Sequence, residues 1–339
     1  MSKDRNPLDE RMHAVRDEPA WSESYYFNFV DPANRLAMFT RMGFRPGDGW
    51  ADGLHVVYLG GDRVAFTYGR RTIERDLSHY DGDLEVGGLI LECVEPFGLW
   101  RVRYSGPAQD IADASILLER SKSRPAGWYR DAKLEMAVDF KALTEPHYAA
   151  GGTRGHFEQT GEVRGAVTID GHTTQVHGFG VRDKSWGPRD WGAAAAPGSA
   201  GGLGVARSRP SEPAPFVNWF SINFGPSFAL GGSCGRADDG MMRGSGWIHH
   251  EGRTEDLHDV VIDSTYHDGS ILHKEIKLSG RAASGKKIEV DGRILTVCPT
   301  KIPMPGGATF VNEGLAEFRT EGHIGFGISE HWHRVVGAG

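Results

Sequence analysis

Alternation of hydrophobic and polar residues with a period of two dominates the chain. Clear examples are residues 64–68, 100–104 and 134–141. Successive side chains of a strand point to opposite faces, so this pattern is typical of strands with one buried face. Helical periodicity is scarce, and the apolar positions of its best candidate, residues 110–122, would serve a strand equally well. The chain is therefore predicted to be mostly antiparallel β.

Turn residues support this prediction. The chain contains 47 glycines among 339 residues, and Asp-Gly occurs at Asp48, Asp52, Asp81, Asp170, Asp239, Asp268 and Asp291. Asp-Gly suits type I′ turns, in which both central residues need positive φ. We predict one hairpin around Asp170-Gly171, between residues 163–169 and 173–178. A second is predicted around Asp291-Gly292, between residues 287–290 and 293–297.

Strands that recur about every ten residues over a chain of 339 residues predict two tandem barrels or sandwiches, with few short helices. Residues 192–204, GAAAAPGSAGGLG, are small and nearly featureless, which is typical of a linker or loop. The predicted division is a charged arm (1–20), a first β domain (21–192), a linker or loop (193–204) and a second β domain (205–339). Direct comparison of the sequence with itself shows no internal repeat.

Composition excludes several classes of protein. Hydrophobic residues make up 39% and charged residues 24%, as in soluble globular proteins, and no run approaches the roughly 18 to 20 apolar residues of a membrane-spanning helix. The net charge of −7, with scattered basic residues, argues against a nucleic-acid partner. The three cysteines lie far apart, so neither disulfides nor a cysteine zinc site is expected. The charged start lacks the apolar core of a secretory signal, and a cytoplasmic location is expected.

The most unusual stretch is Gly178–Trp191, GFGVRDKSWGPRDW. Burial beside tryptophans is expected to raise the pKa of Asp183 into a range useful for proton transfer. An alternative is that ion pairs among Arg182, Arg189, Asp183 and Asp190 pin a loop that closes a barrel, with the tryptophans as a plug. The two interpretations are compatible if Arg189 and Asp190 support the loop while Asp183 faces a cavity.

Two histidine clusters are further candidates. His156 and Glu158 would share one face of a strand and could complete an acid/base set with Asp183. His331 and His333 would also share a face, and imidazole pairs bind Zn, Fe or Cu, so a metal site there stays an alternative. The chain has no phosphate-binding loop, no GxSxG elbow and no HExxH motif, and we expect no nucleotide cofactor.

The segment Arg182–Trp191, RDKSWGPRDW, preceded by His156-Phe157-Glu158-Gln159, resembles the RDxSWGxRDW signature of the carotenoid 1,2-hydratase and AttH-like group. Residues 23–32 at the start and residues 312–314 and 325–330 at the end also resemble that group. The resemblance covers nearly the whole chain. It implies two tandem lipocalin-like antiparallel β units with an apolar cavity.

For function, the resemblance implies that Asp183 matches the acid that protonates an alkene and that His156 matches a functional histidine. Val181 and Glu158 differ from the usual hydratase residues, so proton-driven chemistry on an apolar substrate other than a carotenoid is expected.

These observations predict a cofactor-independent hydratase, dehydratase, isomerase or cyclase. It would act on a largely apolar terpenoid, polyketide or aromatic compound, in a cavity between the two β units. Asp183 would move the proton, with His156 and Glu158 sharing or tuning it. The expected substrate-binding residues are the aromatic Tyr26, Trp186, Trp191 and Trp219, whose indoles would also favour a carbocation-like state. The alternatives are a non-catalytic carrier or sensor of a hydrophobic ligand, and a metal-dependent enzyme using His331 and His333.

Overall fold

The structure is a computed structural model that describes residues 6–16, 20–149, 155–189, 191, 215–236 and 242–336. The chain divides into two compact units. The first comprises Met1–Ile111 with Tyr129–Arg189, and the second comprises Ala112–Trp128 with Asp190–Gly339. The prediction of an all-β fold is confirmed. Within the described ranges, the helices are short 3-10 turns, and none is long and apolar enough to span a membrane.

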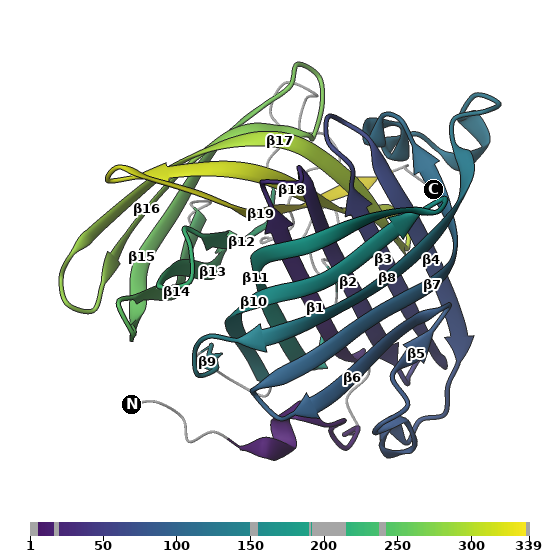
Figure 1. Ribbon diagram of the computed structural model, residues 1–339, viewed down its shortest axis with the longest axis horizontal. Helices are drawn as coiled ribbons and strands as arrows, with labels where there is room; N and C mark the ends of the chain where they lie inside the picture. The colour runs from purple at the N-terminus through teal and green to yellow at the C-terminus, as the bar shows by residue number, and fades with distance from the viewer. Residues whose placement is uncertain are drawn as a thin grey trace. The chain divides into compact units, whose positions relative to one another are not determined.

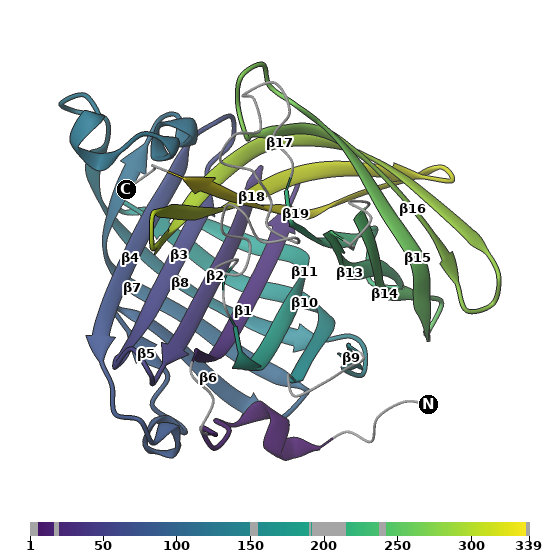
Figure 2. The same cartoon turned by 180° about the vertical axis from the view of Figure 1, so that it is seen from behind.

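The first unit is one antiparallel sheet, ordered β4-β3-β2-β1-β11-β10-β8-β7-β6-β5, with β9 paired to β10. Pairing of β4 with β7 joins the two ends of the main run of strands, so that this part of the sheet closes on itself. Figures 1 and 2 show β1 to β4 side by side, with β11 next to β1 and β10 beyond β11. The strands are β1 (Trp21–Asp31), β2 (Leu36–Arg45), β3 (Trp50–Tyr58), β4 (Val64–Thr72), β5 (Glu85–Val86), β6 (Leu89–Glu95), β7 (Leu99–Ile111), β8 (Arg130–Ala142), β9 (His147–Tyr148), β10 (Gly155–Ile169) and β11 (His172–Pro188).

The second unit is a closed antiparallel barrel in which each strand pairs with its sequence neighbour and β12 pairs with β19 (Figure 1). Its strands are β12 (Val217–Asn223), β13 (Phe228–Arg236), β14 (Met242–His250), β15 (Arg253–Tyr266), β16 (His273–Ala282), β17 (Lys287–Met304), β18 (Gly307–Thr320) and β19 (His323–Val336). Closure leaves no unpaired edge, which removes the usual route to edge-to-edge aggregation.

Each unit has its own hydrophobic core. In the first unit, apolar residues of alternate positions cluster around Trp100 and Phe140. In the second, the core surrounds Phe220 and Phe318. The 3-10 turn η1 (Pro7–Glu10) belongs to the first unit, and Met12, just after it, packs into that core. Burial of these alternate positions is the dominant favourable contribution to folding.

The two units share a local sequence pattern that direct comparison misses. In each unit the first strand pairs with the last, and the last strand contains Gly-Phe-Gly followed by Val or Ile, at Gly178–Val181 and Gly325–Ile328. A Cβ atom at Gly180 would lie 1.7 Å from the carbonyl oxygen of Asn28, and one at Gly327 would lie 1.8 Å from that of Ser221. Both glycines therefore allow the first strand to approach closely.

The pattern extends to charged positions. Asp183 and Glu330 stand at the same place after Gly-Phe-Gly, and each lies opposite an acidic residue of the preceding strand, Glu158 and Glu313 respectively. The two units therefore resemble each other in strand register, although direct comparison of the sequence with itself shows no repeat. The two strands share too few identical residues for the repeat to be recognised without the register.

Some turn predictions hold and others fail. The hairpin at Asp170-Gly171 is confirmed, and both residues have positive φ. The hairpin at Asp291-Gly292 is wrong, because these residues lie inside β17. A Cβ atom at Gly292 would lie 2.7 Å from Ile276 and 2.8 Å from Phe318, so close packing explains this glycine.

The ambiguous segment 110–122 forms the end of β7 followed by the 3-10 turns η3 (Ala114–Leu118) and η4, which starts at Ser121. An α-helix is not formed there. The turns η2 (Leu77–Tyr80) and η4 (Ser121–Ser123) complete the short helical elements in the part of the chain that is described. The predicted linker 193–204 lies outside the described residues.

Candidate acid/base site

Strands β10 and β11 bring the predicted acid/base residues together. The hairpin register sets Glu158 opposite Asp183 and His156 opposite Ser185. Because side chains alternate along a strand, His156, Glu158, Asp183 and Ser185 share one face of the sheet. Arg182, Lys184 and Trp186 therefore point to the other face, toward the core of the first unit. The RDKSW motif thus divides between two faces.

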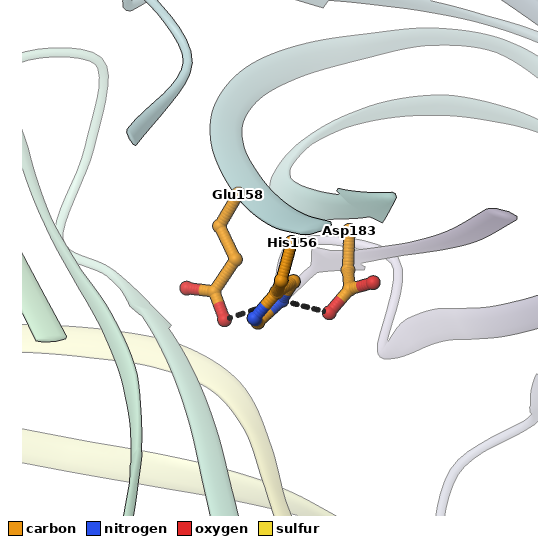
Figure 3. Close-up of side chains that lie close together, drawn as sticks. All are labelled: His156, Glu158 and Asp183. Atoms are coloured by element: carbon orange, nitrogen blue, oxygen red, sulfur yellow. Dashed lines mark hydrogen bonds and ion pairs between the residues drawn. The ribbon is translucent and has the colours of Figure 1, made fainter. Parts of the chain in front are cut away.

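The His156 imidazole lies between two carboxylates, as Figure 3 shows. Its Nε2 atom is 2.5 Å from Oδ2 of Asp183 and 3.4 Å from Oε1 of Glu158. The side chains of His156 and Asp183 keep 25% and 17% of their surface exposed, whereas Glu158 keeps 5%. The first two side chains are thus partly exposed, and Glu158 is buried.

The charges of this group follow from its contacts. Burial alone would lower the pKa of His156, but attraction and a hydrogen bond to Asp183, together with the charge of Glu158, raise it to about 9. Burial alone would raise the pKa of Asp183, but His156, Arg189 and Arg41 outweigh it, and the pKa is lowered. The expectation of a raised pKa for Asp183 is therefore wrong. Near neutral pH these pKa shifts favour an imidazolium at His156 beside a carboxylate at Asp183.

Polar groups that the sequence did not single out extend the site along the same face. Ser24 lies opposite Ser185, with their hydroxyl oxygens 2.9 Å apart, and a guanidinium N–H of Arg189 donates to Ser185 Oγ at 3.2 Å. Tyr26 lies opposite Asp183, and Arg41 lies opposite Tyr26. Ser185 could have been found from its spacing of two from Asp183. Ser24 and Arg41 depend on pairing of distant strands.

Arg182, Lys184 and Trp186 lie apart from this face. Arg182 forms a bidentate ion pair with Glu10 at 2.6 and 2.9 Å, and both side chains are buried. Lys184 is paired with Glu23 in the interior. Trp186 stacks on His13 with ring centroids 4.0 Å apart. The N-terminal segment thus contacts the motif on the core side, and the structure does not bring Trp186 to Asp183.

The remaining predicted aromatic residues belong to the second unit. Trp191 stacks on Trp332 with centroids 5.4 Å apart and planes within 7° of parallel. Trp219 lies in β12, opposite Glu330 of β19. Asp190, predicted to support the loop, lies outside the described residues.

The alternative metal residues lie inside the second barrel. His331 and His333 are completely buried, and His331 stacks on His273 with centroids 3.8 Å apart. The hydroxyl of Tyr266 is 3.0 Å from Nδ1 of His331. Among the described residues, the group of three whose ligand atoms lie within 4.8 Å of one another is instead His156, Glu158 and Asp183. One imidazole and two carboxylates could hold a divalent cation such as Mn²⁺, Fe²⁺ or Zn²⁺.

The chain belongs to a family described as a domain of unknown function, DUF7064, whose model matches residues 6–335. No curated protein sequence matches the chain.

Three solved structures share the fold. A candidate AttH protein from Nitrosomonas europaea is 12% identical, with a TM-score of 0.56 and 94% of each chain covered. CghA, solved with Sch210972, is 11% identical, with a TM-score of 0.55, covering 94% of this chain and 89% of CghA. Kievitone hydratase from Nectria haematococca is 8% identical, with a TM-score of 0.52, covering 93% and 89%. The expected lipocalin-like fold of the AttH-like group is thereby shown.

Proposed function

We propose that this protein is an acid/base enzyme that needs no organic cofactor and adds water to, removes water from, isomerises or cyclises a largely apolar small molecule. One observation carries the proposal: the imidazole of His156 lies between two carboxylates on a sheet face, 2.5 Å from Asp183. A hydratase by name, kievitone hydratase, shares the fold, which supports the class of reaction but specifies no substrate.

The roles follow from the charges of the group. His156, held as an imidazolium by Asp183, donates a proton to the substrate. Glu158, a buried carboxylate 3.4 Å from the same ring nitrogen, accepts a proton from water or from the substrate. Asp183 orients the ring and keeps it charged, as the carboxylate does in other His-carboxylate pairs. The acid and base therefore belong to one hydrogen-bonded group.

The first test is to extract the purified protein with organic solvent and identify any retained compound by mass spectrometry. That compound is then offered to the wild type and to Asp183→Asn. We expect the variant to bind it with nearly unchanged affinity and to turn it over at least about 100-fold more slowly. Glu162→Gln on the same strand, whose carboxylate pairs with Arg164 and His177 instead, is the matched control.

Three results would overturn the proposal. Unchanged turnover in Asp183→Asn would remove the proton-transfer role. Binding without turnover by the wild type would make the protein a carrier. Loss of activity on treatment with a chelator, restored by Mn²⁺ or Zn²⁺, would show that His156, Glu158 and Asp183 bind a catalytic metal ion instead.

A further inference from the structure

Positive and hydrogen-bond-donating groups surround the proton donor on its face of the sheet. Beside His156 lies the chain of hydroxyls formed by Ser185 and Ser24, to which Arg189 donates. The guanidinium of Arg41 bends back over Gly43, where a Cβ atom would lie 2.4 Å from its nitrogens. Because Gly43 pairs with Ser24, this second guanidinium lies next to the hydroxyls.

These hydroxyl and guanidinium groups are held in place by hydrogen bonds and by burial. Arg41 is held by Asp52, with Nη1 3.0 Å from Oδ1, and Ser24 and Ser185 are both 4% exposed. Fixed donors in a partly buried site stabilise negative charge that develops on an oxygen, and they cost no reorganisation when it forms. Guanidinium groups are particularly suited to binding oxyanions.

The same groups disfavour a carbocation. The guanidinium groups beside the hydroxyls would repel positive charge that develops at that end of the site, whereas the carboxylates of Asp183 and Glu158 already face the His156 ring. The indole of Trp186, which the sequence suggested as a stabilising wall, lies on the opposite face of the sheet and stacks on His13. An imidazolium is also a weak acid for an isolated alkene, whereas its strength suits protonation of an enolate.

Building on the proposed function, we propose that the substrate carries a carbonyl group conjugated to, or adjacent to, its reacting carbons. Ser24, Ser185 and Arg189 bind that carbonyl oxygen as it becomes an enolate. Arg41 stabilises the same negative charge from the neighbouring strand. The substrate class is thereby narrowed from any apolar alkene to enones and their hydrated or isomeric ketones.

In the direction of hydration, one water molecule adds across the carbon–carbon double bond of the enone. The oxygen of water bonds to the β carbon while Glu158 takes one proton of that water, and the π electrons move to give the enolate. The α carbon then takes a proton from His156, and the carbonyl re-forms. Transfer of the proton from Glu158 to the neutral imidazole restores both groups, so that one water has been added and nothing else consumed.

The test uses probes that do not require the natural substrate. The wild type is incubated in D₂O with 4-phenylbutan-2-one, and exchange of the α protons is followed by ¹H NMR. A parallel sample contains 1-phenyl-1-butene, which lacks the carbonyl, and hydration is followed by gas chromatography. We expect exchange with the ketone and no hydration of the alkene. Exchange should fall at least about 100-fold in Ser185→Ala and in Arg189→Gln, as for loss of one oxyanion donor.

Arg101→Gln on β7, where Arg101 pairs with exposed carboxylates, is the matched arginine control and should exchange at the wild-type rate. A second readout is the colour of bound 4-nitrophenol, whose phenolate is yellow. We expect binding to raise the ionised fraction at fixed pH, and Ser185→Ala to reduce that rise. This readout detects the oxyanion site even if exchange is slow.

The outcomes separate this inference from the proposed function. Hydration of the alkene without ketone exchange would overturn the inference and leave the acid/base proposal standing. Wild-type exchange rates in both Ser185→Ala and Arg189→Gln, with an unchanged effect on 4-nitrophenol, would also overturn it. Absence of exchange, of hydration and of any effect on 4-nitrophenol would overturn both.

Discussion

At the scale of single residues, the charge of His156 depends on one neighbour. Asp183 provides both the strongest attraction and the hydrogen bond that raise the pKa of the imidazole to about 9. In Asp183→Asn the burial of the ring is no longer offset by that carboxylate. We therefore expect the pKa of His156 to fall by at least about one unit, which NMR titration of the ring protons would measure.

Activity should follow the same ionisation. The imidazolium acid is present below its pKa, so the wild-type rate is expected to hold through neutral pH and to decline as the pH rises through about 9. In the residual activity of Glu158→Gln, which lacks the proposed base, the decline should move to lower pH by less than in Asp183→Asn, because Glu158 is farther from the ring, at 3.4 Å against 2.5 Å. If the rate depends on pH in the same way in the wild type and in both variants, His156 does not donate the proton.

The other face of the same motif is expected to contribute to stability. Glu10 and Arg182 are 4% and 1% exposed, and their pair is bidentate. Removal of one partner leaves the other charge buried, which typically costs about 3 to 5 kcal/mol. Glu10→Gln should therefore lower the urea midpoint of the first unit markedly. Glu321→Gln, which breaks the exposed pair with Lys286, should leave the midpoint of the second unit unchanged.

At the scale of secondary-structure elements, the paired first and last strands depend on glycine in both units. A Cβ atom at Gly180 or Gly327 would stand less than 2 Å from a backbone oxygen, and backbone cannot yield as a flexible side chain can. Gly180→Ala and Gly327→Ala should each destabilise their own unit by about 3 kcal/mol or more, measured by thermal unfolding. Gly235→Ala on β13, where a Cβ atom would meet nothing within 4 Å, is the matched control. Equal melting temperatures in all three variants would contradict this account.

Much of the candidate site could be read from one hairpin. The Asp170-Gly171 turn sets the register of β10 and β11, and alternation then places His156, Glu158 and Asp183 on one face. The pKa direction of Asp183 could not be read in this way, because it depends on charges that face it. Ser24 and Arg41 reach the site through pairing between strands far apart in the sequence, and no local pattern specifies that register.

Glycine in an Asp-Gly pair does not form a turn where it serves close packing instead. Asp52-Gly53 and Asp291-Gly292 lie inside β3 and β17, and the missing side chains admit Val86 in the first case and Ile276 with Phe318 in the second. A dipeptide that favours a turn is thus compatible with a strand when a neighbour occupies the space above the glycine. This information belongs to the tertiary structure.

At the scale of the whole molecule, pH is expected to act differently on the two units. In the second barrel, burial lowers the pKa of His273 and His333 to about 3 and that of His331 well below its ordinary value. The unfolded chain binds these protons at about pH 6.5, so it gains protons before the folded barrel does. The stability that these residues provide is present above about pH 6.5 and is lost as the pH falls toward 3.

Each of these histidines can contribute a slope of up to about 1.4 kcal/mol per pH unit within that window. The buried His55 contributes a similar slope in the first unit, where it is the one histidine of the described residues whose pKa is lowered to about 3. His156 acts in the opposite sense, because its pKa is raised. Its contribution to the stability of the folded state is fully present below about pH 6.5 and is lost as the pH rises through about 9. Between pH 7 and about pH 5, above the range in which Asp183 and other carboxylates with a lowered pKa lose their contribution, the second barrel should therefore lose stability faster than the first unit. Urea titrations between pH 7 and pH 4 would measure this, with His333→Gln giving a shallower slope and the exposed His258→Gln leaving it unchanged. Acid loss of the first unit before the second would show that the three buried histidines do not control acid stability.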